Sequence, residues 1–187
     1  MDSNIIQQFQ KKYESLAGIV HLVSGVSEAA DQVFSILQEK KAEKVALSEF
    51  PEDFGQILEQ KITEDGLELL KPPFNNADLP KAFDTIEAGV SWAAFAIAET
   101  GAIVEFATDD AMRLVAALPL VHISLLRASD FVATLKEAAT PIRNFYEENS
   151  LNATVSFISG PSRTADIEMR LILGVHGPAE THVIIVD

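Results

Sequence analysis

A helix followed directly by a buried strand is predicted in residues 109–126, DDAMRLVAALPLVHISLL. Either aspartate at its start can cap a helix, because a side-chain oxygen there accepts hydrogen bonds from the free N–H groups of the first turn. Pro119 ends the helix, since proline has no N–H to donate. The apolar run Leu120–Leu126 then predicts a strand, with His122 and Ser124 on one face. The unit therefore indicates an α/β protein.

The same alternation of helices and short apolar strands extends along the chain. Helices are expected at residues 4–16, 27–41, 51–62, 82–88 and 129–146, and strands at 45–47, 67–70, 103–106, 154–158 and 182–186. Pro141 should kink or split the helix at residues 129–146. The stretch Trp92–Ala98 fits a helix or a strand. This order is typical of an α/β fold with a mostly parallel sheet covered on both faces. We predict a single domain over residues 1–187, with residues 1–41 as an N-terminal helical region.

Composition excludes several classes of function. The 187 residues include 14 basic and 28 acidic side chains, a net charge of −14, and no cysteine. Such an acidic chain repels phosphate backbones, so we expect no nucleic-acid partner. Without cysteine there is no disulfide, no thiolate nucleophile and no cysteine-bound iron–sulfur cluster. The uncharged apolar stretch Leu114–Leu126 is too short for a membrane span, and the start lacks a signal-peptide pattern, so we expect a soluble, cytoplasmic protein.

A carboxylate interrupts the most apolar part of the chain, at Glu99-Thr100-Gly101. If Glu99 lies in a cleft, it is a candidate catalytic group for proton transfer or nucleophilic attack, with Thr100 and Gly101 beside the ligand. The alternative is a turn, in which Gly101 adopts positive φ and Glu99 faces water.

A second polar segment, SGPSRTADIE at residues 159–168, directly follows a predicted strand. In open α/β sheets ligands bind outside the carboxyl ends of the strands. Arg163 is suited to holding a carboxylate or phosphate. The candidate ligand-binding residues here are Gly160, Ser162, Arg163, Thr164 and Asp166. The alternative is a capped turn in which Arg163 pairs with Asp166 or Glu168.

His176 follows closely, in GVHGP at residues 174–178. It is a second candidate catalytic group, as general acid or base or as a hydrogen-bond partner of a substrate oxygen, and Gly177 lets backbone approach a ligand. The alternative is a structural histidine. A metal site built from His176, Asp166 and Glu168 has no recognised ligand spacing, so we expect no metal.

Several weaker signals are interpreted as structural or as chance. His21, His122 and His182 lie in apolar contexts and are interpreted as core or surface histidines. Gly89–Ala93 faintly resembles a nucleophile elbow but lacks the second glycine. Neither a dinucleotide fingerprint nor a Walker loop is present.

The two polar segments together resemble the LUD-domain family. AIAETG at residues 96–101 is similar to the central motif of that family, while SGPSRTADIE, GVHGP and the apolar end resemble its C-terminal signature. The resemblance covers the chain from about Val45 onward. One departure is Gly101-Ala102, where the family has Gly-Thr.

The resemblance implies a three-layer α/β/α fold like that of sugar-phosphate isomerases and CoA transferases. It also implies a role in oxidising L-lactate to pyruvate with two iron–sulfur partner proteins. Because this chain has no cysteine, we expect no cofactor in it and the iron–sulfur clusters on the partners.

Three functional hypotheses follow. The first is an accessory subunit that binds lactate, pyruvate or another small anion through Arg163 and His176. The second is a stand-alone enzyme acting on a phosphorylated or CoA-linked metabolite, with Glu99 as base or nucleophile. The third is an assembly factor that docks through the apolar stripe of residues 4–16; the alternative for this stripe is that it caps the core.

Overall fold

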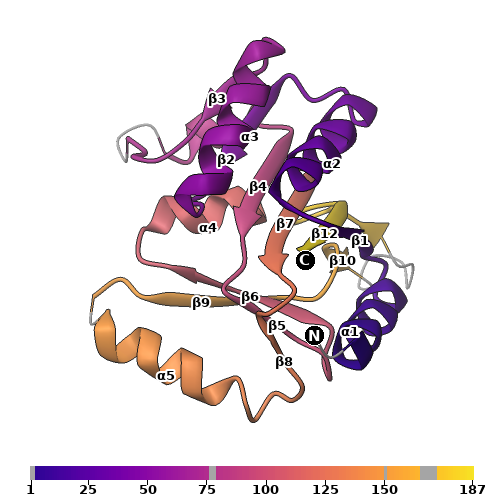
Figure 1. The fold of residues 1–187 in the computed structure, drawn as a ribbon. Helices are drawn as coiled ribbons and strands as arrows, with labels where there is room; N and C mark the ends of the chain where they lie inside the picture. The colour runs from indigo at the N-terminus through magenta and orange to yellow at the C-terminus, as the bar shows by residue number, and fades with distance from the viewer. Residues whose placement is uncertain (1–2, 76–78, 150, 165–171) are drawn as a thin grey trace.

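The computed structural model describes residues 3–75, 79–149, 151–164 and 172–187, and its centre is a six-stranded parallel sheet (Figure 1). The strands lie in the order β1-β12-β7-β4-β2-β3, and every neighbouring pair is parallel. Their bounds are β1 Ile19–Val23, β12 Glu180–Val186, β7 Val121–Arg127, β4 Ala88–Trp92, β2 Lys44–Leu47 and β3 Glu68–Leu70. The central strands are buried on both faces, as their near-continuous apolar sequences require.

Helices cover both faces of this sheet. On one face lie α2 (Val26–Glu39) and α3 (Glu52–Glu64), whose apolar stripes pack on Ile123, Leu125 and Ile184. Alternate strand residues point to the opposite face, where α1 (Ser3–Ser15) and α4 (Asp110–Ala117) pack. Asp109 caps α4 by accepting a hydrogen bond from the Ala111 amide, whereas Gly25, and not Ser27, is the N-cap of α2.

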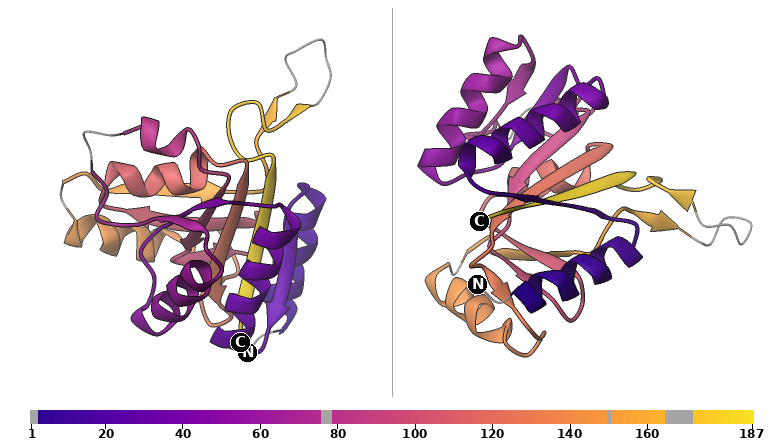
Figure 2. Two further views of the ribbon diagram at one scale, coloured as in Figure 1. Left: turned by 90° about the horizontal axis from the view of Figure 1, so that it is seen from above. Right: turned by 45° about the vertical axis from the view of Figure 1, so that its right-hand side comes forward.

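A second, four-stranded sheet packs beside α1 on that same opposite face. Its order is β8-β5-β6-β9, with bounds β8 Phe131–Val132, β5 Phe95–Ile97, β6 Ala102–Ala107 and β9 Thr154–Ile158. The β5–β6 and β6–β9 pairs are antiparallel. Its outer side is covered by α5 (Ala139–Glu148), and Phe145 of α5 stacks on Phe106 at 4.2 Å between ring centroids. The small hairpin of β10 (Arg163–Thr164) and β11 (Ile172–Leu173) stands away from the body (Figure 2).

The predicted α/β fold, with a mostly parallel sheet and helices on both faces, is confirmed. The stripe of α1 is buried in the chain's own core through Ile6, Phe9 and Tyr13, so it caps the core. This burial removes the stripe as a docking surface for a partner. The four-stranded sheet is not among the sequence predictions.

Two predicted helices are wrong. Residues 82–88 form only a 3-10 turn, Lys81–Phe83, and Ala88 already begins β4. Residues 129–146 do not form one helix, because Phe131–Val132 pairs with β5 and α5 begins only at Ala139. Pro141 thus lies in the first turn of α5, where its missing N–H has no helical acceptor to lose. The ambiguous stretch at 92–98 is extended and contains β5.

Candidate functional site

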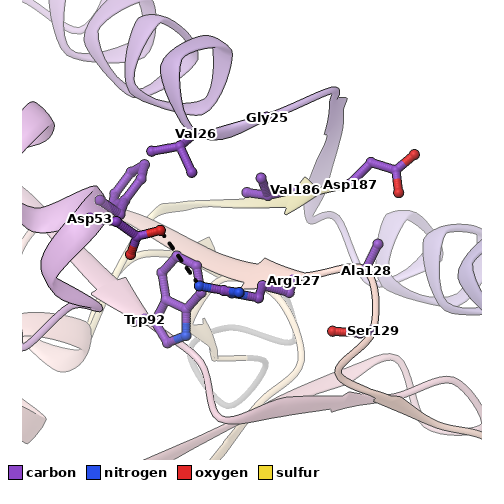
Figure 3. A pocket seen from close by; sticks show the side chains of 10 residues that line it. Gly25, Val26, Asp53, Trp92, Arg127, Ala128, Ser129, Val186 and Asp187 are labelled. Atoms are coloured by element: carbon purple, nitrogen blue, oxygen red, sulfur yellow. Dashed lines mark ion pairs between the residues drawn. The ribbon is translucent and has the colours of Figure 1, made fainter.

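A cavity of about 500 Å³ lies where four parallel strands end, and we call it the carboxyl-edge cavity (Figure 3). Gly25 follows β1, Asp187 follows β12, Arg127 ends β7 and Trp92 ends β4. Ligands of open α/β sheets bind at this edge because the loops that follow the strands converge there. The volume is within the usual range for a small-molecule site.

Arg127 is the basic group of this cavity. Its side chain is 53% exposed, and Nη2 lies 3.7 Å from Asp53 Oδ2, too far for a hydrogen bond. Figure 3 shows Arg127 reaching across the cavity toward Asp53, beside the Trp92 ring. The guanidinium therefore keeps donors for a ligand carboxylate, which it can bind in bidentate geometry.

The N-terminus of α2 borders the same cavity. Its N-cap, Gly25, has no side chain to accept from the first-turn N–H groups, and Val26 lines the cavity. Free N–H groups at a helix N-terminus attract anions. Asp53 and Asp187 oppose a large anionic charge, so the cavity suits a small monovalent anion that displaces Asp53 from Arg127.

A second, smaller cavity of about 190 Å³ lies between the two sheets at the ends of β2 and β4, and we call it the inter-sheet cavity. Its lining includes Ser48, Trp92, Glu105 and Ser156. Glu105 projects from β6 toward the parallel sheet and is only 9% exposed. Trp92 belongs to the walls of both cavities.

Behind Glu105 lies a buried polar cluster formed by Ser91, His122 and Ser124. Glu105 Oε1 accepts hydrogen bonds from Ser91 Oγ at 2.5 Å and from Ser124 Oγ at 3.1 Å. His122 Nε2 lies 2.7 Å from Ser91 Oγ, while His122 Nδ1 is buried without a partner among the described residues. These donors compensate the desolvation of a carboxylate between two sheets.

This cluster contains serine, histidine and a carboxylate, but its geometry is not that of a nucleophilic triad. Ser91 and Glu105 both face His122 Nε2, whereas a triad places the acid on the other nitrogen. Ser91 is also only 1% exposed, so no substrate reaches its hydroxyl. The weak elbow signal at Gly89–Ala93 therefore marks a buried strand.

The Glu99-Thr100-Gly101 segment forms the turn between β5 and β6. Glu99 is exposed, and its Oε2 accepts a 2.8 Å hydrogen bond from the Leu135 amide. Thr100 Oγ1 is buried and has no partner among the residues described. Gly101 has φ +62°, and a Cβ there would lie 2.7 Å from Lys12 Cγ. The turn thus packs closely on the last part of α1.

The segment after β9 reaches the same end of α1. Gly160 has φ +95°, and a Cβ there would lie 2.6 Å from the Leu16 carbonyl oxygen. Ser162 donates its amide to Pro178 O at 2.8 Å, and its own carbonyl accepts the Gly174 amide at 2.9 Å. The two predicted motifs are thus brought to one end of α1 through Gly101 and Gly160.

The remaining predicted residues of this segment lie near or on the small hairpin. Arg163 and His176 are exposed, Thr164 is half-buried, and Gly177 packs against Ser162. Asp166 lies outside the described residues. The roles assigned to Glu99, Arg163 and His176 stay predictions.

The position of this segment follows from the sheet to which its preceding strand belongs. β9 is part of the four-stranded sheet, and the chain then enters β12 at its amino end. Residues 159–164 and 172–179 therefore lie at the edge opposite the carboxyl-edge cavity. The rule that ligands bind after parallel strands does not apply to a segment that follows an antiparallel one.

Two stacked histidines occupy that amino-terminal edge. His21 Nε2 lies 3.0 Å from His182 Nδ1, and His182 Nε2 lies 2.7 Å from Glu180 Oε1. Burial lowers the pKa of both histidines. Glu180 also accepts a 2.8 Å hydrogen bond from Lys40 Nζ, which contributes to a raised lysine pKa. Within the described residues, no three His, Cys, Asp or Glu side chains are placed to hold a metal ion.

Sequence analysis did not identify Arg127 or Glu105 as site residues. The sequence contains one indication of Glu105. Ser91, His122 and Ser124 are polar residues at buried positions of otherwise apolar strands. Such residues need partners across the core. Arg127 carries no comparable signal, because its position at the edge depends on strand order.

The architecture defines a mostly parallel α/β protein, and the family follows from comparison with known proteins. A model described as the LUD domain matches residues 6–186. The chain belongs to the LUD-domain family. This agrees with the resemblance carried by residues 96–101 and 159–178.

Several curated relatives are called lactate utilization protein C. The one from Shouchella clausii is 36% identical over 117 residues, which is 61% of this chain and 51% of that protein. The one from Bacillus subtilis is 34% identical over 108 residues, 57% of this chain and 45% of that protein. The matched region thus spans about half the length of these relatives.

One solved structure has the same fold. A DUF162 family protein from Deinococcus radiodurans superposes with a TM-score of 0.69 at 21% identity, covering 99% of this chain and 98% of that one. At this identity the likeness establishes the fold alone.

Proposed function

We propose that this chain acts in lactate utilization, as an accessory subunit that binds a small carboxylate metabolite. The names of its relatives support the pathway. With its iron–sulfur partner proteins it would oxidise L-lactate to pyruvate in the cytoplasm. The chain contains no cysteine, so the clusters that accept the electrons belong to the partners in this proposal. In the described residues no helix has the length and apolarity to cross a membrane.

The observation that carries the binding role is Arg127 in the carboxyl-edge cavity. Its guanidinium is loosely paired with Asp53, the helix N-terminus at Gly25 adds N–H donors, and Trp92 supplies an apolar wall. A monocarboxylate such as lactate or pyruvate has a single negative charge, which can pair with Arg127. The rest of the ligand carries no charge that would have to be desolvated on binding. We therefore propose Arg127 as the anchor of the ligand carboxylate.

A titration with L-lactate and pyruvate tests this role. Trp92 is the single tryptophan and lines the cavity, so its fluorescence reports binding. Arg127→Ala should weaken binding at least about tenfold, because a charged bidentate contact contributes about 1.5–3 kcal/mol. Arg143→Ala, an exposed change on α5, is the matched control and should leave affinity unchanged.

Arg163→Ala separates the two candidate locations. The carboxyl-edge site predicts unchanged affinity in this variant. Loss of binding with Arg163→Ala but not with Arg127→Ala would place the site on the C-terminal segment and overturn the role of Arg127.

The accessory role is tested in the reconstituted complex. Lactate-dependent dye reduction by the iron–sulfur partners should require this chain, and equal activity without it would refute the proposal. The proton-transfer roles predicted for Glu99 and His176 are tested in the same assay. Glu99→Gln and His176→Gln should each lower turnover about 10²-fold or more if these groups transfer protons. Unchanged turnover excludes that role.

A further inference from the structure

The inter-sheet cavity has a buried acceptor that the network around it does not use. Glu105 Oε1 receives both serine hydroxyls, whereas Oε2 has no partner among the described residues. The side chain keeps 11% of its surface exposed, and it lines the cavity. An oxygen that has no protein donor and opens onto a cavity can accept a hydrogen bond from a ligand, and a nearly buried charge is stabilised by such a donor.

The charge around the cavity favours a cation as that donor. Glu49 and Glu105 are the two acidic groups of the lining, and Arg113 is its basic group. Arg113 already pairs with Asp110 on the surface of α4. The cavity is therefore locally negative, and the charge of −14 on the whole chain adds to this field.

Other groups of the cavity suit an ammonium better than a metal ion. Trp92 provides aromatic surface for a cation. The Ser156 hydroxyl has no partner among the described residues and can accept one N–H. Two carboxylates and one aromatic ring form a poor set of ligands for a hard divalent ion, which needs six or more oxygen atoms.

We propose that the inter-sheet cavity is a binding site for a small primary ammonium compound, whose N–H groups donate to Glu105 Oε2 and Ser156 Oγ. Ser91 and Ser124 are positioning residues that hold Glu105 through its other oxygen. His122 supports Ser91 from behind. The site differs from the carboxyl-edge cavity in location and in the charge that it selects, and it does not depend on a role in lactate utilization.

Three probes of similar size test the chemistry. The full chain is titrated with n-propylammonium, with the neutral isostere 1-propanol and with tetramethylammonium, which is a cation without N–H. Backbone amide and Trp92 indole NMR shifts are followed. We expect saturable binding of n-propylammonium at Glu105 and Ser156, and at least about tenfold weaker binding of the other two. Equal binding of tetramethylammonium, or no saturable shift at these residues, would overturn the proposal.

Glu105→Gln tests the residue. The amide oxygen still accepts from Ser91 and Ser124, but an N–H₂ group replaces the free oxygen. Affinity for n-propylammonium should fall at least about tenfold, whereas Glu147→Gln, the same charge change at an exposed position of α5, should leave it unchanged. Unaltered affinity in Glu105→Gln would refute the site.

Ala94→Leu provides an independent variant if Glu105→Gln does not fold. Ala94 lines the cavity and lies outside the hydrogen-bonded cluster, so leucine fills the space and leaves Glu105 intact. We expect loss of n-propylammonium binding with the cluster preserved. Unchanged binding in this variant would contradict the location of the site.

Discussion

Ser91 Oγ donates a 2.5 Å hydrogen bond to Glu105 Oε1, and this contact joins β4 of the parallel sheet to β6 of the four-stranded sheet. Both residues are buried, and 14 positions separate them in sequence. The bond therefore ties the two sheets together while it presents the other oxygen of Glu105 to the inter-sheet cavity.

Ser91→Ala should destabilise the protein by about 1–3 kcal/mol, because Glu105 and His122 each lose a buried partner. Urea unfolding followed by circular dichroism measures the change. Ser35→Ala, at an exposed position of α2, should shift the free energy of unfolding by less than about 0.5 kcal/mol. Equal effects of the two changes would show that the Ser91 bond contributes nothing net.

Gly101→Ala should destabilise the protein more than Gly66→Ala, although both glycines have positive φ. At Gly66 (φ +80°) a Cβ meets nothing within 4 Å, so only backbone strain of about 1–2 kcal/mol is expected. At Gly101 the Cβ also meets Lys12 and the Tyr13 amide nitrogen at 2.7–2.9 Å, so α1 must shift. Thermal unfolding of both variants measures the difference. Equal losses of stability would mean that α1 can shift at no energetic cost.

Tyr13→Phe should leave stability unchanged or raise it slightly. The Tyr13 hydroxyl is buried and forms no well-aligned hydrogen bond among the described residues, with the equally unsatisfied Thr181 hydroxyl near it, and burial raises the pKa of this phenol. Removing an unsatisfied polar group removes a desolvation penalty of about 1–3 kcal/mol, while the ring contact with Phe9 remains. Denaturant unfolding measures the result. A loss above about 1 kcal/mol would show that the hydroxyl is hydrogen-bonded in solution.

Stability should fall as pH drops below 6.5, in part through His21 and His182. Burial holds the pKa of both below the ordinary value of 6.5, so between that value and the folded pKa the unfolded chain binds more protons. Their contribution is complete above 6.5 and is lost on acidification, with a slope of at most about 1.4 kcal/mol per pH unit for each histidine. Urea unfolding across this range measures the slope.

The double variant His21→Gln/His182→Gln isolates the contribution of the pair. It should flatten the slope just below pH 6.5, since carboxylates titrate mainly at lower pH. An unchanged slope in the variant would assign the acid sensitivity to other groups.

Local patterns predicted most of the elements of this fold. The apolar stripe of α1, the Asp109 cap of α4 and the run of β7 each follow from periodicity or capping within one short window. The helix predicted at residues 129–146 was wrong because the prediction used only local spacing. The pairing of Phe131 with Ala96 joins residues that are far apart in the sequence. A short strand that is stabilised by pairing with a distant strand shows little strand pattern in its own sequence.

The sequence by itself determined the α/β class, the acidic charge, the lack of cysteine and, through two motifs, the family. Only the tertiary structure decided which polar groups meet. Strand order places Arg127 with the α2 N-terminus at the carboxyl edge, and it places residues 159–164 and 172–179 at the opposite edge. The contact between Glu105 and Ser91 depends on two sheets packing face to face. Helical and strand periodicity are properties of neighbouring residues, whereas a site is assembled from strands whose order no local pattern encodes.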